Sequence, residues 1–163
     1  KAGVFICLQL LEKFDVIKGF FPVAEETGCH GSRGAKEDFF KDVGYAIQFD
    51  STENDTMSLS LMGTQLFEQD SEFFNKTKGL ILEHGFTEWR HHPYTDTMVL
   101  KERFNFACLN FAAGYYNYHT DNEYVIVEDV LNSTLLGESV IKELGNEFYE
   151  FKVPKKGSFG WFD

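Results

Sequence analysis

Short apolar runs alternate with segments of helical spacing along this chain, and few fold classes accommodate that order. Apolar residues at positions 4, 5, 7, 8, 10 and 11 predict a helix over 2–13. Strands that alternate with helices predict an α/β fold, a sandwich of helices around a mixed sheet. The further helices are expected at 38–40, 64–84, 96–103 and 126–144, and the strands at 16–23, 45–49, 57–62, 106–111 and 146–153.

Polar side chains of a reactive kind follow several of these expected strands. Glu25 and Glu26 come after the first strand, Asp50 after the second, and His119 lies in the expected loop 114–124. Ligands of open α/β sheets bind beyond the carboxyl ends of the strands. Four groups of metal-ligand or base type at equivalent strand ends therefore predict a common site.

Glu25 and Glu26 are the most informative pair, because two adjacent carboxylates after an apolar run are costly unless both charges are used. A sharp turn would let both side chains face one site, and the glycines at 28, 31 and 34 suit such a turn. One carboxylate can then bind a metal while its neighbour transfers a proton. Metal-assisted hydrolysis requires that division of labour.

Bulk composition limits the classes of function. The 163 residues suit one domain, expected over 1–153 with a tail over 154–163, and no repeat or linker is evident. A net charge of -11 argues against non-specific binding to nucleic acid or anionic membranes. No apolar run reaches the roughly 20 residues that span a bilayer. Three unpatterned cysteines indicate reduced thiols and a cytoplasmic protein.

The ordered set of motifs resembles the co-catalytic zinc exopeptidases, a clan with leucyl-type aminopeptidases, peptidase T, glutamyl aminopeptidases and related deacylases. Each motif alone is weak, and the order with its spacing carries the resemblance over most of the chain. The matching elements are Lys1-Ala2-Gly3-Val4, Glu25-Glu26-Thr27-Gly28, Asp50, Thr95-Asp96 and Tyr118-His119-Thr120.

The resemblance implies a role for each matching residue. Glu25 would be the general base, which takes a proton from the attacking water and passes it to the leaving amine. Glu26 and His119 would bind one zinc ion and Asp50 a second, with Asp96 as a supporting residue. Manganese or cobalt could replace zinc in such a mixed oxygen and nitrogen ligand set.

Two departures from the family pattern shape the expectation. The family also carries a His-x-Asp element and a metal-bridging Asp, both of which would precede Lys1. We therefore expect this chain to be the C-terminal part of a longer enzyme and, by itself, to bind zinc weakly and show little activity. The short stretch between Asp50 and His119 predicts the type without a lid domain.

The predicted function is a zinc-dependent, aminopeptidase-like exopeptidase that hydrolyses peptide bonds near a free terminus. A deacylase or amidohydrolase acting on N-acyl amino acids is the alternative within the same scaffold, and a catalytically inactive fragment or binding module is the alternative outside it. A homo-oligomer is possible. Among the candidate residues, Asp50 could instead form a turn and His119 could stack among tyrosines. His91 and His92, in the expected loop 91–94, could bind metal or simply be polar loop residues.

Overall fold

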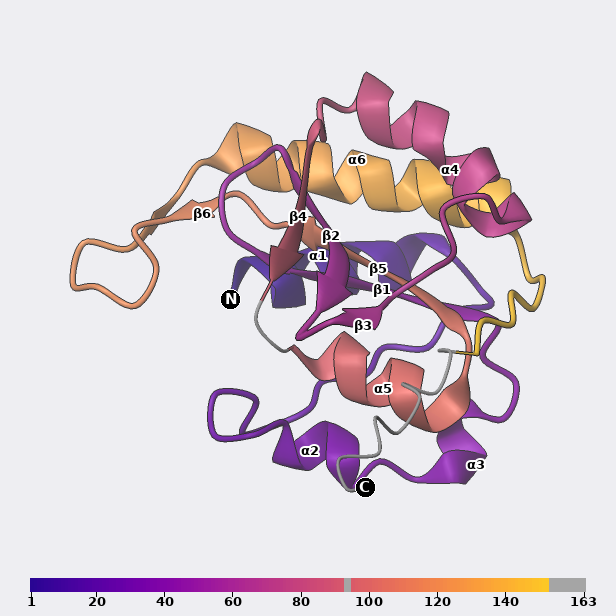
Figure 1. Ribbon diagram of the computed structural model, residues 1–163. Coiled ribbons are helices and arrows are strands. Elements are labelled where there is room, and N and C mark those ends of the chain that lie inside the picture. The colour runs from indigo at the N-terminus through magenta and orange to yellow at the C-terminus, as the bar shows by residue number, and fades with distance from the viewer. Residues whose placement is uncertain (93–94, 153–163) are drawn as a thin grey trace, which may run out of the picture.

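Helices lie on both faces of a mixed sheet in the computed structural model, which describes residues 1–92 and 95–152 (Figure 1). One face is covered by α1 (Ala2–Lys13), α4 (Glu72–Glu83) and α6 (Val127–Leu144). The other face carries α2 (His30–Arg33), α3 (Glu37–Phe40) and α5 (Asp96–Phe104). Among the described residues, no helix is both long enough and apolar enough to cross a membrane.

The sheet has five strands, in the order β1-β5-β2-β3, with β4 paired to β2. β1 and β5 are parallel, as are β2 and β4, whereas β2 runs antiparallel to both β5 and β3. The predicted α/β class with a mixed sheet is confirmed at that level. The strands are β1 (Tyr45–Ser51), β2 (Thr56–Leu61), β3 (Thr64–Gln65), β4 (Glu88–His92) and β5 (Ala107–Ala112).

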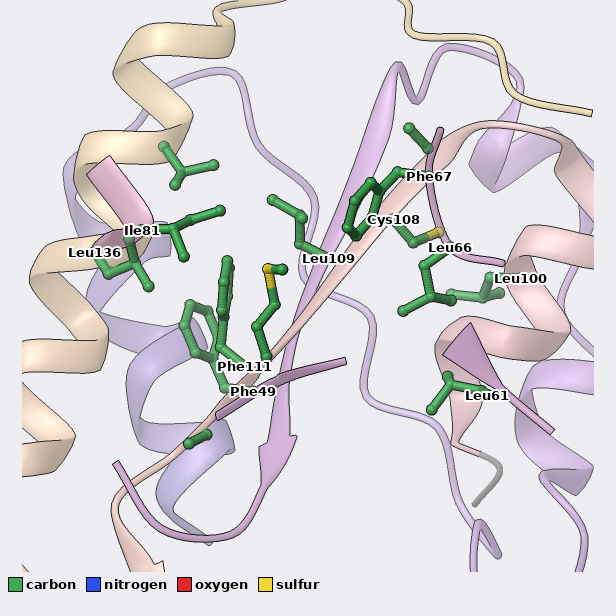
Figure 2. Close-up of a cluster of buried hydrophobic side chains, with 14 of the residues drawn as sticks. Phe49, Leu61, Leu66, Phe67, Ile81, Leu100, Cys108, Leu109, Phe111 and Leu136 are labelled. Carbon is green, nitrogen blue, oxygen red and sulfur yellow. The ribbon is translucent and has the colours of Figure 1, made fainter. Parts of the chain in front are cut away.

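The core is built around β5, whose six residues are all buried. A strand covered by helices on both faces reads as a continuous apolar run, and alternate side chains enter opposite layers. Leu109 and Phe111 point toward the layer with Phe49, Ile81 and Leu136 (Figure 2). Cys108 points the other way, among Leu66 and Leu100. β5, which pairs with the Asp50-bearing strand β1, is thus packed on both faces.

Local sequence patterns predicted most elements to within a few residues. The helix at 2–13 is α1 with the predicted bounds, and the strands at 45–49, 57–62 and 106–111 correspond to β1, β2 and β5. The helices at 38–40, 96–103 and 126–144 correspond to α3, α5 and α6. These predictions are confirmed.

The predicted strand at 16–23 is wrong, because within the described part of the chain this segment pairs with no other strand. Val16, Phe21 and Val23 are exposed, while Ile17 and Phe20 pack against the core. An apolar run satisfies the strand pattern, but a strand exists only where a neighbour accepts its hydrogen bonds.

Three further boundaries differ from the sequence prediction. The helix expected from residue 64 starts only at Glu72, where the hydroxyl of Ser71 accepts a hydrogen bond from the Phe74 N–H at 3.3 Å and so caps it. The loop expected at 114–124 contains a hairpin of β6 (Tyr115–Tyr116) and β7 (Tyr124–Val125). The last expected strand is reduced to one bridge between Phe106 and Glu150. The predicted tail lies outside the described residues.

Candidate functional site

The turn that carries Glu25 and Glu26 is present, although no strand leads into it. The N–H groups of Gly28 and Cys29 both donate to the Glu25 carbonyl oxygen at 2.9 Å. Gly28 has a φ of +118°, a conformation that glycine adopts without strain. A Cβ at Gly31 would lie 2.5 Å from the backbone nitrogen of Val23, so that close approach also requires glycine. The predicted conformational role is confirmed for Gly28, whereas Gly31 is required by this close approach and not by its backbone conformation.

Asp50 is held at the carboxyl end of β1 by three hydrogen bonds, two of them to residues of other elements. Its N–H donates to Oδ1 of Asn110 on β5 at 3.2 Å. Its carbonyl oxygen accepts from the Tyr115 hydroxyl, at the base of the hairpin, at 3.2 Å. Its Oδ2 accepts from Nε2 of Gln48 at 3.2 Å. Both the backbone and the side chain of this predicted ligand are therefore fixed in direction.

His119 lies in the loop that joins β6 to β7, on a hairpin that projects from the body of the molecule (Figure 1). Its Nε2 is 3.5 Å from Oε1 of Glu26. The hairpin is fixed near its base, where the Tyr116 ring stacks on Tyr124 and the Tyr116 hydroxyl donates to Oδ2 of Asp129 at 2.6 Å. The structure thus brings together the two residues predicted to share one zinc ion.

Asp96, predicted as a supporting residue, lies close enough to Glu25 for its charge to raise the pKa of Glu25. It begins α5 and is buried, and its Oδ1 accepts a hydrogen bond from the hydroxyl of Ser32. Ser32 follows the turn of Glu25 and Glu26, so Asp96 ties α5 to that turn. We call Glu25, Glu26, Asp50 and Asp96 the acidic cluster.

The charges of the acidic cluster act on one another. The pKa of Glu25 is raised from its ordinary 4.5 to about 7, chiefly by burial and then by the charges of Asp50, Glu26 and Asp96. The pKa of Asp50 is raised to about 6 by burial and by the charges of Asp96 and Glu26, while His119 opposes the shift. Burial also raises the pKa of Asp96. The carboxyl group of Glu25 therefore titrates near neutral pH.

The side chains of the acidic cluster and His119 are of types that bind metal ions, but they are not arranged around a common point. Carboxylates and an imidazole are ligands that zinc accepts, and a cation would relieve the mutual repulsion that raises these pKa values. Within residues 1–92 and 95–152, however, no three His, Cys, Asp or Glu side chains form a group that could hold a metal ion. The part of the chain that the structure describes therefore contains no assembled metal site.

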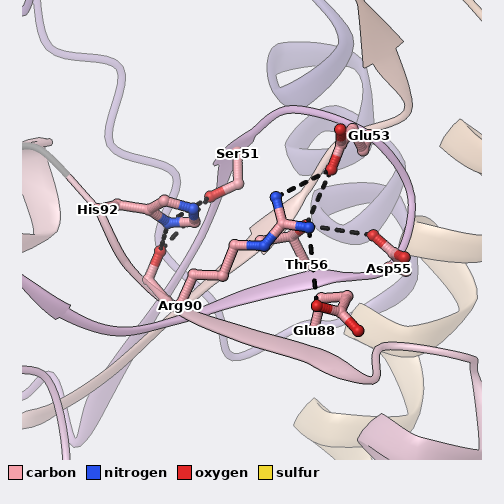
Figure 3. A network of polar contacts seen from close by, with 8 residues as sticks. Ser51, Glu53, Asp55, Thr56, Glu88, Arg90 and His92 are labelled. Carbon is pink, nitrogen blue, oxygen red and sulfur yellow. Dashed lines mark hydrogen bonds and ion pairs between the residues drawn. The ribbon is translucent and has the colours of Figure 1, made fainter.

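A second polar network, around β4, was missed by the sequence analysis. His91 and His92 lie in β4 and not in a loop, so that prediction is wrong. Nδ1 of His92 is 2.6 Å from the Ser58 hydroxyl, and burial lowers the pKa of this histidine. Figure 3 shows the ring beside Ser51 and the Arg90 guanidinium beside Glu53. Nη1 of Arg90 in β4 lies 3.2 Å from Oε2 of Glu53, which follows β1. The serines at alternate positions 58 and 60 of an expected strand were the feature of the sequence that could have indicated this network.

A separate cavity of about 330 Å³ opens beside β2 and β3. Its polar lining includes Ser60 and His91, which are cross-strand neighbours whose Oγ and Nδ1 lie 2.7 Å apart. The lining residues are a different set from the acidic cluster, so this cavity and the predicted site are distinct. The residues that line the cavity are Leu59, Ser60, Gly63, Gln65, Phe67, Gln69 and His91.

Comparison with known proteins adds no identification. No protein-family model matches the chain, and no curated protein matches it. The resemblance to zinc exopeptidases therefore stays a prediction that depends on the residues of the acidic cluster and His119.

Proposed function

We propose that this chain belongs to a zinc-dependent, aminopeptidase-like hydrolase. The observation that carries the proposal is the gathering of Glu25, Glu26, Asp50 and His119, residues far apart in sequence, at one edge of the fold. These are the four residues to which the resemblance assigns the chemistry. An arbitrary set of acidic residues on a chain of net charge -11 would be expected to spread over the surface.

Glu25 is suited to the role of general base. A base works best when its pKa lies near the working pH, and the pKa of Glu25 is raised to about 7. Its carboxylate would take a proton from the attacking water and return it to the amine that leaves. Glu26, Asp50 and His119 would hold the metal ions. Bound zinc would lower the pKa of the water and polarise the carbonyl of the substrate.

Further ligands are required for a dinuclear centre, and the family pattern places them before Lys1. The amino group of Lys1 lies near enough to Asp50 to lower its pKa. Residues placed before Lys1 in a longer chain would therefore lie beside the acidic cluster. Their expected content is a His-x-Asp element and an Asp two residues before Lys1.

The test is zinc calorimetry on this chain and on a version extended upstream of Lys1, together with hydrolysis of an aminoacyl chromogenic amide. The variant is His119→Ala, and the matched control is His91→Ala, which removes an exposed imidazole from the other polar network. We expect tight zinc binding and zinc-dependent hydrolysis in the extended chain. Substitution of His119 should weaken binding about ten- to hundredfold, and that of His91 should not.

Two results would overturn the proposal. Equal zinc affinity in the His119→Ala and His91→Ala variants would remove His119 from the ligand set. Absence of zinc-dependent hydrolysis from an extended chain that binds zinc would favour an inactive binding module. Hydrolysis of N-acyl amino acids in preference to aminoacyl amides would instead select the deacylase alternative.

A further inference from the structure

Gln48 connects two elements of the candidate site through the two ends of its side-chain amide. Its Oε1 accepts hydrogen bonds from the Thr97 N–H at 3.1 Å, the Thr97 hydroxyl at 2.5 Å and the Thr95 hydroxyl at 2.9 Å. Its Nε2 donates to Oδ2 of Asp50 at 3.2 Å. A backbone N–H can only donate, so the bond from Thr97 fixes which end of the amide is oxygen.

The first turn of α5 is the shared support of the acidic cluster. Thr95 and Thr97 hold Gln48 and, through it, the side chain of Asp50. Asp96, between them, accepts from Ser32 and so holds the turn of Glu25 and Glu26. The relative placement of the proposed base and of the proposed ligand Asp50 therefore depends on this one helical turn.

We propose that Gln48 is a positioning residue for Asp50, an inference that rests on the proposed function. The backbone of Asp50 is already fixed by Asn110 and Tyr115. Rotation of its side chain is restrained by Gln48, which lies two residues earlier on the same side of β1. With Oδ2 bound to the amide, the carboxylate is held in one orientation beside Gln48. Hydrogen bonds of this kind orient metal-binding carboxylates.

The rival role for Gln48 is purely structural, since its Oε1 also satisfies the buried start of α5. Two measurements separate the roles. The first needs no metal and is the side-chain rotamer of Asp50, obtained by NMR from three-bond couplings. The second is the zinc affinity of the extended chain. The variant is Gln48→Met, which keeps the length of the side chain and removes both the donor and the acceptor.

A control for the loss of a buried hydrogen bond away from the site is Ser133→Ala. The Ser133 hydroxyl is buried and donates to the Ala112 carbonyl oxygen at 2.9 Å, on the α6 face of the sheet. Its loss should lower the melting temperature, although less than Gln48→Met does, because it removes one hydrogen bond and Gln48→Met removes four. It should leave both the Asp50 rotamer and the zinc affinity unchanged.

We expect Asp50 to populate one rotamer in the unmodified chain and several in Gln48→Met, with zinc affinity reduced about ten- to hundredfold. A single Asp50 rotamer in Gln48→Met would overturn the positioning role whether or not zinc binds. Equal losses of affinity in Gln48→Met and Ser133→Ala would also overturn it, in favour of a structural role. Failure of the unmodified extended chain to bind zinc would overturn the proposed function. In that case a loss of the single Asp50 rotamer in Gln48→Met would still support the role of Gln48 in orienting the Asp50 side chain.

Discussion

Nε2 of His119, in the loop between β6 and β7, lies 3.5 Å from Oε1 of Glu26, in the turn before α2. The His119 side chain is 65% exposed and that of Glu26 is 72% exposed, so solvent screens the pair and it contributes little to folding. The hairpin is placed instead by Tyr116 on Asp129 and by Tyr115 on the Asp50 carbonyl. The hydrogen bonds of Tyr115 and Tyr116, and not the ion pair, therefore bring His119 and Glu26 together.

Folding stability should decrease as the pH rises from about 4 to about 8. The folded-state pKa values of Glu25 and Asp50 are about 7 and about 6, above their ordinary 4.5 and 3.8. Raised pKa values stabilise the fold fully below the ordinary values, and this contribution is lost as the pH rises through 6 and 7. We expect a combined loss of roughly 1–3 kcal/mol, discounted for the partial exposure of Glu25. Urea unfolding in EDTA at several pH values measures it.

The Asp50→Asn variant isolates this effect from other titrations. It should be more stable than the unmodified chain at pH 8 and show a flatter dependence on pH. Asp15→Asn, at an exposed position in the turn after α1, is the matched control and should leave the curve unchanged. A curve for Asp50→Asn that runs parallel to that of the unmodified chain would contradict the electrostatic account.

Two helical glycines are expected to respond to alanine in opposite directions. A Cβ at Gly3 in α1 would lie 2.2 Å from the Phe49 carbonyl oxygen, a backbone atom of β1 that cannot move aside. Gly3→Ala should therefore destabilise the fold by about 2 kcal/mol or more. Gly79 in α4 has open space around its Cβ position, so Gly79→Ala should stabilise by about 0.5–1 kcal/mol through helix propensity. Thermal unfolding compares them, and a Gly3→Ala variant as stable as the unmodified chain would show that α1 does not pack on β1 this closely.

The link between Ser32 and Asp96 should be worth more than an ordinary surface hydrogen bond. Ser32 is fully buried and donates to a carboxylate that is itself buried. Ser32→Ala should therefore cost about 1–3 kcal/mol in urea unfolding. Ser139→Ala removes a hydroxyl bonded within α6 and should change stability by no more than about 0.5 kcal/mol. Equal effects of the two substitutions would mean that the turn of Glu25 is not tied to α5 through Ser32.

Local periodicity explains which elements the sequence could predict. α1 has apolar residues at helical spacing along its whole length, and β5 is an unbroken buried run, so both are encoded within their own segments. The run at 16–23 has the same apolar character but has no partner strand in the part of the chain that the structure describes, and pairing is not a local property. β4 is the reverse case. Its sequence Glu-Trp-Arg-His-His has no strand pattern, and β2 alone makes it a strand.

In the candidate site too, some residues could be predicted from the sequence and others could not. The order of Glu25, Glu26, Asp50 and His119 could be found from the sequence because carboxylates and histidine after expected strands stand out. Gln48 and Asn110 could not be found. They are register partners on β1 and β5, and nothing in either segment sets them apart until the two strands are paired. Residues that hold a site in place depend on tertiary register, whereas residues that do the chemistry have recognisable types.

The roles proposed for Glu25 and Glu26 lead to different kinetic and binding effects in an extended, zinc-loaded chain. Glu25→Gln should lower kcat/KM by about 10²–10⁴ while zinc affinity stays within about threefold, because a base is lost and a ligand is not. Glu26→Gln should weaken zinc binding by about tenfold or more, since an amide oxygen is a poorer ligand than a carboxylate.

The pH profile of kcat/KM provides an independent check on Glu25. A general base must be deprotonated, so activity should rise with pH along an acid limb. Without a bound cation, the pKa of Glu25 is about 7. A bound cation would lower this pKa because it favours the charged carboxylate. The limb should therefore have its midpoint below pH 7, and it should be absent from the residual activity of Glu25→Gln. A limb that persists unchanged in Glu25→Gln would assign the titration to another group and remove Glu25 from the role of base.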